Sequence, residues 1–202
     1  MAASVLLAVG DVQQVIDGVA EITRKIRVGV DLGPVISQAA MERITAAITE
    51  AERMGATVLV DGRNVKAPGG AGYWVGPTVL DRVTAQMPAG CEELFGPVLS
   101  IQRVPTLDQA IAIENASPYG NAACIYTTNG GVARYAIERF ESGMCGVNIG
   151  VPVPREPFAF GGWNDSKFGN GDLTGMDGWR FWSRPRKVTT KWSVQTDTNW
   201  MS

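Results

Sequence analysis

This 202-residue chain contains no histidine, which limits the side chains that could carry out catalysis or bind a metal. That absence excludes Ser-His-Asp and Cys-His catalysis and every metal site with an imidazole ligand. Three cysteines remain as candidate nucleophiles: Cys91, Cys124 and Cys145. They form no CxxC pair and no zinc spacing, so we expect no metal site. An odd, dispersed set of thiols is typical of a reducing compartment, and Cys124 and Cys145 have the apolar neighbours of core residues.

Two adjacent carboxylates, Glu92 and Glu93, precede an apolar segment, and Phe95 follows Glu93 by two residues. Adjacent glutamates most often form a solvated turn, because unpaired glutamate is rarely buried. A carboxylate and an aromatic ring at the mouth of a sheet can also hold a ribose by its hydroxyl groups, as an acidic residue does in dinucleotide-binding folds. The spacing alone leaves both interpretations open.

Two further patterns, a glycine-rich segment and a basic, aromatic cluster, could each bind a ligand. Both are more typical of surfaces that contact other parts of a protein. Gly169, Gly171 and Gly175 are spaced GxGxxxG, one residue off the dinucleotide fingerprint, and no strand-turn-helix pattern surrounds them. A basic and aromatic cluster follows, of a kind that could stack on single-stranded nucleic acid. The net charge of −2 argues against that ligand, and tryptophan and arginine are enriched at protein interfaces. The cluster comprises Trp179, Arg180, Phe181, Trp182, Arg184, Arg186 and Lys187.

The elements that must position these residues have the pattern of an α/β fold. Cap chemistry marks the helix starts: Asp11, Ser37, and Thr106 with Gln109 three residues later. Gly55 stands where a glycine should end the second helix. From the apolar spacing we predict helices over residues 11–26, 37–54, 106–113 and 132–140, the last closed by Gly143, and strands over 4–9, 57–60, 98–104, 122–127 and 146–149.

Alternating strands and helices with short connections predict a parallel sheet with right-handed crossovers. Such a sheet binds ligands beyond the carboxyl ends of its strands, which directs attention to the segment after Ile149. Prolines and glycines make the stretch 63–97 loop-rich and predict an irregular stretch from Val151 to Gly178. A long irregular stretch is more often functional or contact-forming than idle.

The end of the chain predicts an intermolecular contact. Lys187–Trp192 alternates apolar and polar side chains, as expected for a strand with one buried face that adds to another subunit's sheet. Ser193–Ser202 reads as a frayed polar tail. No apolar run reaches the length of a membrane span, and residues 4–9 lack the basic start of a signal peptide. We therefore expect a soluble, cytoplasmic protein with neither membrane nor nucleic acid as a partner.

Five short motifs are spread along the chain: Leu32–Ser37 (LGPVIS), Tyr73–Leu80 (YWVGPTVL), Glu92–Leu99 (EELFGPVL), Pro118–Asn121 (PYGN) and Phe160–Gly162 (FGG). They resemble motifs of the aldehyde dehydrogenase superfamily and occur in the family order. Two further segments, Val147–Pro154 and the loop Trp163–Gly171, resemble the methylmalonate-semialdehyde dehydrogenase branch, which acylates CoA. The resemblance covers roughly residues 1–192 and is closest to that branch.

The resemblance implies an α/β fold, the parallel-sheet catalytic domain of the family, and NAD-dependent oxidation of a small-molecule semialdehyde. In that chemistry a cysteine thiolate attacks the aldehyde, hydride passes to NAD, and CoA resolves the thioester. By the same resemblance Glu93 would hold the nicotinamide-side ribose, with Phe95 beside the nicotinamide. Phe160 would line the aldehyde pocket, and Asn148 lies where the family's chain passes that pocket.

The resemblance also implies what the chain lacks. The family's nucleophile lies in a GQ-x-C-M-A motif; Met1 and Ala2 resemble the residues after that cysteine, and none of the three cysteines present has its context. We therefore expect an incomplete catalytic domain over residues 1–182, without the nucleophile or the NAD-binding half, and an oligomerisation strand and tail over 183–202. The isolated chain should be inactive and homo-oligomeric. The alternative is a non-catalytic assembly or binding module that pairs with itself or with a full-length relative.

Overall fold

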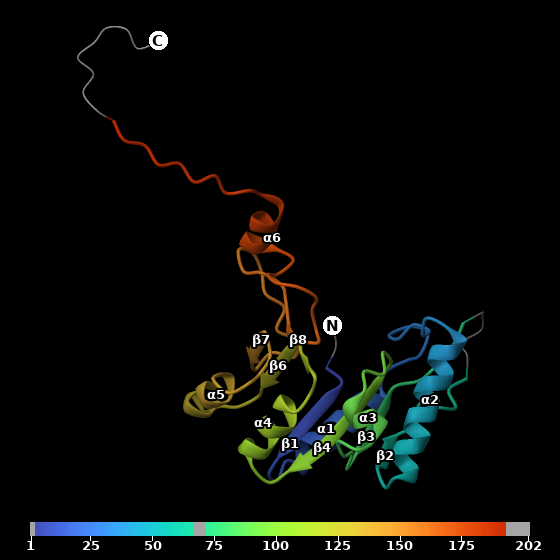
Figure 1. Cartoon of the computed structure of the whole chain (residues 1–202). Helices are drawn as coiled ribbons and strands as arrows, with labels where there is room; N and C mark the ends of the chain where they lie inside the picture. Colours follow the sequence, from blue (N-terminus) through green and yellow to red (C-terminus); the bar gives the residue numbers. More distant parts are fainter. Residues whose placement is uncertain (1–2, 67–71, 193–202) are drawn as a thin grey trace, which may run out of the picture.

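The computed structural model describes residues 3–66 and 72–192, and its first half is built around a four-stranded sheet (Figure 1). The strand order is β1-β4-β3-β2. Strands β1 and β3 run parallel to β4 on its two sides, whereas β2 is antiparallel to β3 at one edge. The strands are β1 (Val5–Val9), β2 (Thr57–Val60), β3 (Thr78–Asp81) and β4 (Val98–Val104).

Helices cover both faces of this sheet. Ile44 and Ile48 of α2 (Gln38–Arg53) form one buried cluster with Leu80 of β3. Ile16 of α1 (Gln13–Arg24) forms a second cluster with Val79. Because successive side chains of a strand point to opposite faces, Val79 and Leu80 bury the two sides of β3 under different helices. All four residues of β3 are buried.

The rest of the chain forms smaller units beside this sheet. Strands β6 and β7 make a parallel pair, and β5 pairs antiparallel with β8. Figure 1 shows α6 and the segment after it projecting away from the other elements. The remaining elements are α3 (Pro88–Cys91), α4 (Leu107–Asn115), β5 (Tyr119–Gly120), β6 (Ala122–Ile125), α5 (Gly130–Ile137), β7 (Met144–Val147), β8 (Trp163–Asn164) and α6 (Gly175–Trp182).

The predicted α/β class is confirmed, but the pairing of the strands differs from the prediction. We expected 98–104, 122–127 and 146–149 to form one parallel sheet. A strand has two edges, and both edges of β4 are occupied, by β1 and β3. β6 therefore cannot join the sheet beside β4, and within the described residues it forms a separate two-stranded sheet with β7. The central strand β3 was not predicted, because it lies in the stretch 63–97 that composition marks as loop-rich.

The predicted ends of α2 and the start of α4 are confirmed. The Ser37 hydroxyl accepts a hydrogen bond from the backbone N–H of Ala40 at 3.1 Å. The helix ends at Arg53, and Gly55, two residues later, has a φ of +105° in the left-handed region. Thr106 caps α4 by accepting from the N–H of Gln109 at 3.3 Å. Each of these signals is local, which is why sequence alone located them.

Three other boundaries were predicted wrongly. The N-cap position of the first helix is Val12, which makes no capping hydrogen bond, rather than Asp11. The Asp11 carboxylate accepts a long bond of 3.4 Å from the N–H of Gln13. Helix α5 ends at Ile137, well before Gly143. Helix α6 begins inside the stretch 151–178 that we expected to be irregular.

Lys187–Trp192 is not a strand within this chain. It has no ladder partner among the described residues, and Val188 and Trp192 are 75% and 90% exposed. A strand needs a neighbour to satisfy its backbone groups, so the predicted pairing with another subunit stays a prediction. The polar tail predicted over 193–202 lies outside the described residues. Across residues 3–66 and 72–192, no helix has the length and apolar character needed to cross a membrane.

Candidate functional site

The segment Glu92–Pro97, called here the 92–97 loop, connects α3 to the central strands and is fixed at both ends. The N–H of Glu92 donates to the carbonyl of Pro88 at 2.9 Å, which caps α3. The carbonyl of Pro97 accepts from the N–H of Thr78 at 2.8 Å, at the first residue of β3. The loop is therefore anchored to a helix on one side and to the buried sheet on the other.

Within this loop, buried and exposed residues alternate sharply. Leu94 is buried in the α2 cluster, whereas the Phe95 ring is 78% exposed. A Cβ added at Gly96 would lie 2.5 Å from Cδ1 of Ile44, so α2 packs directly on the backbone there. Phe95 has a φ of +50°, in the left-handed region that non-glycine residues rarely adopt. The loop thus holds an aromatic ring out to solvent by an unusual backbone geometry.

Glu93 precedes Phe95 by two residues and is exposed. Within residues 3–66 and 72–192 its carboxylate has neither a hydrogen-bond donor nor an ion-pair partner. A free, ionised carboxylate offers two oxygens as acceptors. Glu93 and Phe95, the two residues predicted to contact a dinucleotide, are therefore brought together on one anchored loop with their side chains available.

Asn148 follows the end of β7 and joins it to the end of β6. Its side-chain oxygen accepts from the N–H of Thr127 at 2.9 Å, and its side-chain nitrogen donates to the carbonyl of Thr127 at 3.0 Å. Asn148 also has a positive φ, +54°. The Asn148 side chain therefore makes the two backbone hydrogen bonds to Thr127 that a paired strand would make, and so holds the turn after β7.

Phe160 is half-buried, and its backbone is tied to the residues before α6. Its N–H donates to the Thr174 hydroxyl at 2.9 Å, and its carbonyl accepts from the N–H of Leu173 at 3.2 Å. Sequence neighbours of Asn148 and Phe160, including Val147 and Ala159, line an open cavity of about 540 Å³ against β7. No hydrogen bond connects this group to the 92–97 loop among the described residues.

The cysteines do not have the surroundings of an activated nucleophile. Burial raises the pKa of the Cys124 thiol. Burial also raises the pKa of Cys145, and the nearby Glu114 carboxylate adds to this shift. Cys91 is exposed and donates to the carbonyl of Met87 at 3.3 Å. Positive charge or a helix N-terminus lowers the pKa of a reactive cysteine. Cys124 and Cys145 have the opposite shift, and Cys91 is the last residue of α3 rather than the first, so the geometry gives no reason to assign any of the three as the nucleophile.

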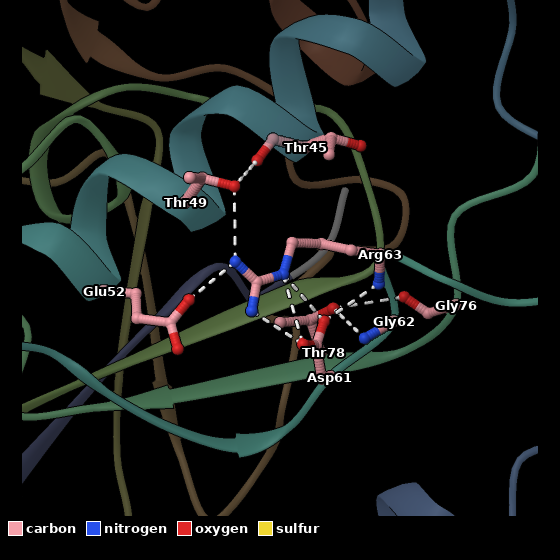
Figure 2. Close-up of polar contacts among 8 residues, drawn as sticks. All are labelled: Thr45, Thr49, Glu52, Asp61, Gly62, Arg63, Gly76 and Thr78. Carbon is pink, nitrogen blue, oxygen red and sulfur yellow. Dashed lines mark hydrogen bonds and ion pairs between the residues drawn. The ribbon is translucent and has the colours of Figure 1, made fainter.

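A polar cluster that the sequence did not reveal surrounds Arg63 (Figure 2). Its guanidinium contacts Asp61 at 2.6 Å and Glu52 at 2.7 Å and donates to the hydroxyl of Thr49 at 3.2 Å. The Arg63 side chain is only 16% exposed, and the guanidinium lowers the pKa of Asp61. The cluster ties the end of β2 to α2. A cavity of about 550 Å³ adjoins it, but two carboxylates already neutralise the guanidinium, so an anion site is not supported there.

Comparison with known proteins places these features in a family. The sequence profile described as "Aldehyde dehydrogenase family" matches residues 1–188. Malonate-semialdehyde dehydrogenase 1 from Geobacillus thermodenitrificans is 44% identical over 199 residues, which are 95% of this chain and 41% of the relative. Malonate-semialdehyde dehydrogenase 2 from Bacillus anthracis has the same identity and the same shares.

Solved structures of the same family also match this chain. The methylmalonate-semialdehyde dehydrogenase DddC from Oceanimonas doudoroffii matches with a TM-score of 0.90 and 39% identity, over 95% of this chain and 41% of that one. An NAD+ complex of aldehyde dehydrogenase from Bacillus cereus matches with a TM-score of 0.76 and 27% identity, over 86% of this chain and 36% of that one. The chain thus spans less than half the length of these relatives.

Proposed function

The chain belongs to the aldehyde dehydrogenase family, as its motifs indicate, and from that premise we propose that it supplies part of an NAD-dependent dehydrogenase that oxidises malonate semialdehyde or methylmalonate semialdehyde to an acyl-CoA. The names of its relatives support the substrate class. The observation that carries the proposal is the 92–97 loop, which exposes the Glu93 carboxylate and, two residues later, the Phe95 ring.

The residues of this loop fit the ribose and nicotinamide of NAD. The two oxygens of Glu93 can accept hydrogen bonds from ribose hydroxyl groups, and such charge-assisted bonds are stronger than neutral ones. The exposed face of Phe95 offers an apolar contact for the nicotinamide ring. When bound, NAD supplies the hydride acceptor. The chain's own part is to bind and orient the ribose.

The cavity against β7 is the proposed aldehyde pocket. Ala159 lines this cavity, whereas the side chain of the next residue, Phe160, is not among its lining residues. The backbone of Phe160 is held by the Thr174 hydroxyl. The amide of Asn148 is occupied by Thr127, so its proposed role is to shape the turn that bounds the pocket rather than to bind the aldehyde oxygen. The proposed aldehyde contacts therefore lie in a later part of the chain than the 92–97 loop, which carries the proposed cofactor contacts.

The attacking thiolate is proposed to lie outside these residues, since Cys91, Cys124 and Cys145 lack the surroundings that activate a cysteine. CoA is the proposed acceptor of the acyl group. The isolated chain should therefore give no aldehyde oxidation, because loss of a covalent nucleophile typically costs several powers of ten in rate. A reducing compartment such as the cytoplasm is the proposed location, and the three dispersed, free cysteines support it.

Residues 183–202 are proposed to serve oligomerisation, with Lys187–Trp192 pairing with a second copy. The exposed Val188 and Trp192 favour this role and also favour the second candidate function, a non-catalytic assembly module. Light scattering on the wild type and on Val188→Pro measures it, because proline removes a ladder hydrogen bond from a paired strand. The wild type should associate and the variant should not; a monomeric wild type would contradict the proposal.

A segment exchange tests the catalytic proposal. In the Geobacillus thermodenitrificans relative, the matching segment is replaced by this chain, and NADH formation is followed with malonate semialdehyde and CoA. Glu93→Gln should lower kcat/KM by at least about tenfold, because the negative charge is lost and one of the two acceptor oxygens becomes a donor. The adjacent Glu92→Gln is the matched control and should have little effect. Equal activity of the two variants would refute the role of Glu93.

The isolated chain provides the second arm of this test. It should form no NADH under the same conditions. Turnover by the chain alone would show that our account of the nucleophile is wrong, and loss of that turnover on replacing one of the three cysteines by serine would identify that cysteine as the nucleophile.

A further inference from the structure

Helix α2 reaches the 92–97 loop through a cation. A terminal nitrogen of Arg43 donates to the carbonyl oxygen of Leu94 at 2.8 Å, a contact between residues 51 positions apart. Within residues 3–66 and 72–192 the Arg43 guanidinium has no carboxylate partner. The Arg43 guanidinium therefore donates to the backbone of this loop rather than to a carboxylate.

The next residue of α2 holds the loop at a second point. Ile44 is fully buried, and its side chain packs against the backbone of Gly96. The two contacts fall on either side of Phe95: Arg43 holds the carbonyl before it, and Ile44 supports the residue after it. Two adjacent residues of one helix thus bracket the exposed ring.

The geometry of Phe95 depends on the carbonyl that Arg43 holds. The carbonyl of Leu94 belongs to the peptide plane directly before Phe95, and the orientation of that plane sets the φ angle of Phe95. That angle, +50°, is unfavourable for a residue with a side chain and persists only where the surroundings impose it. Without the guanidinium, the peptide plane is free to rotate and the ring can leave its exposed position.

We propose that Arg43 is the positioning residue of the cofactor-binding loop: by fixing the peptide between Leu94 and Phe95, it holds the Glu93 carboxylate and the Phe95 ring in the arrangement that receives the ribose and nicotinamide. The role of Arg43 rests on the proposed function of that loop. Arg53, on the same helix, supplies a matched control, because it pairs with Glu50 in an exposed contact and does not reach the loop.

Proteolysis of the whole chain tests the positioning directly. A glutamyl endopeptidase cleaves after Glu93 only when the loop opens, so its rate reports the local opening equilibrium. Arg43→Ala should speed cleavage between Glu93 and Leu94 about tenfold, in line with loss of one charged hydrogen bond. Arg43→Lys should restore part of the protection, and Arg53→Ala should match the wild type.

A reference site in the same digest separates local from global loosening. Cleavage after Glu138, at the end of α5, should be unchanged by Arg43→Ala. If the Arg43→Ala and Arg53→Ala variants are cut between Glu93 and Leu94 at the same rate, or if both sites speed up together, the positioning role is overturned.

The segment exchange with the Geobacillus relative provides the functional readout. Arg43→Ala should raise KM for NAD about tenfold and leave kcat within about twofold, because it disorders the cofactor contacts and not the thiol chemistry. Arg43→Lys should recover part of the loss. An unchanged KM for NAD would overturn the proposal even if the loop opens.

The two proposals fail in different ways. If Glu93→Gln has no effect on the exchanged enzyme, the cofactor assignment of the loop is wrong, whatever Arg43 does. If Glu93→Gln is harmful while Arg43→Ala is harmless in both assays, the assignment stands and the positioning role falls.

Discussion

The four-stranded sheet with α1 and α2 and the segment 151–192 are stabilised in opposite ways. In the first region each helix buries apolar side chains against a sheet face, and the whole of β3 is buried. In the second, α6 has no buried residue, and Trp182 is 86% exposed. Burial of apolar surface is the main favourable term in folding, so the first region is held by its own chain. The second lacks that term and presents a surface suited to contacts with other molecules.

The ion pairs show the same contrast. Asp81 and Arg103 meet at 2.7 Å with the Asp81 side chain almost fully buried, and they join two central strands. Asp177 and Arg180 meet at 3.1 Å on α6, where the arginine is largely exposed. The same two residue types therefore contribute differently to stability, because water screens the exposed pair and competes for its hydrogen bonds. The comparison predicts a graded set of mutational effects.

The largest expected difference is between two large-to-small substitutions. Ile48→Ala, in the core under α2, should lower the free energy of unfolding by about 2–5 kcal/mol, because it leaves a cavity. Trp182→Ala, although it removes a larger side chain, should change it by less than about 0.5 kcal/mol. Urea unfolding followed by circular dichroism at low protein concentration measures both. Similar losses in the two variants would show that α6 is packed in solution and that the two regions do not differ.

The next effect comes from breaking the buried ion pair. Arg103→Met should lower the free energy of unfolding by about 2–3 kcal/mol, because it leaves the Asp81 carboxylate without its cation. The same pair gives a pH dependence. Hydrogen bonding from Arg103 holds the pKa of the Asp81 carboxyl below its usual range.

A lowered pKa stabilises the folded chain above the unfolded-state value, and this stability is lost as the pH falls through the folded-state value. Unfolding measured between pH 5 and pH 2 should show an acid loss that is smaller in Arg103→Met. An unchanged acid profile would mean that other carboxylates dominate.

The features that sequence predicted are those with local causes. Ser37 and Gly55 mark the ends of α2 by cap chemistry within one helical turn. The strand β3 escaped prediction because its four residues follow a glycine and a proline, and its burial comes from neighbours on both sides. Its identity as a strand is a property of the assembled sheet.

In the candidate site, too, residues of a contiguous motif were predictable from sequence and long-range contacts were not. Glu93 and Phe95 were identified through a contiguous motif, whose residues are adjacent in the chain. The bond from Arg43 to Leu94 was not, because nothing near either residue marks a contact across 51 positions. The pairing predicted for Lys187–Trp192 also depends on a partner that no local pattern can specify.

A smaller effect compares two helix starts. Ser37→Ala should lower the free energy of unfolding by about 1 kcal/mol, because it removes the hydroxyl that accepts from Ala40. Thr174, at the start of α6, makes no capping bond, since its hydroxyl accepts from the N–H of Phe160 instead. Thr174→Ala should therefore leave the helix content unchanged and increase the exchange rate of the Phe160 amide proton. Loss of helix signal in Thr174→Ala would show that the cap forms in solution.

The smallest expected effect is on the exposed pair of α6. Arg180→Ala should change the free energy of unfolding by no more than about 0.5 kcal/mol in dilute solution, since exposed pairs on a helix contribute little. The informative variable is protein concentration, because a partner that covers α6 makes apparent stability depend on it. If Arg180→Ala has no effect when dilute but lowers the unfolding midpoint of a concentrated sample, the arginine acts in an interface and not within its own helix. The Arg53→Ala variant, which removes a comparable exposed pair on α2, should show no such dependence.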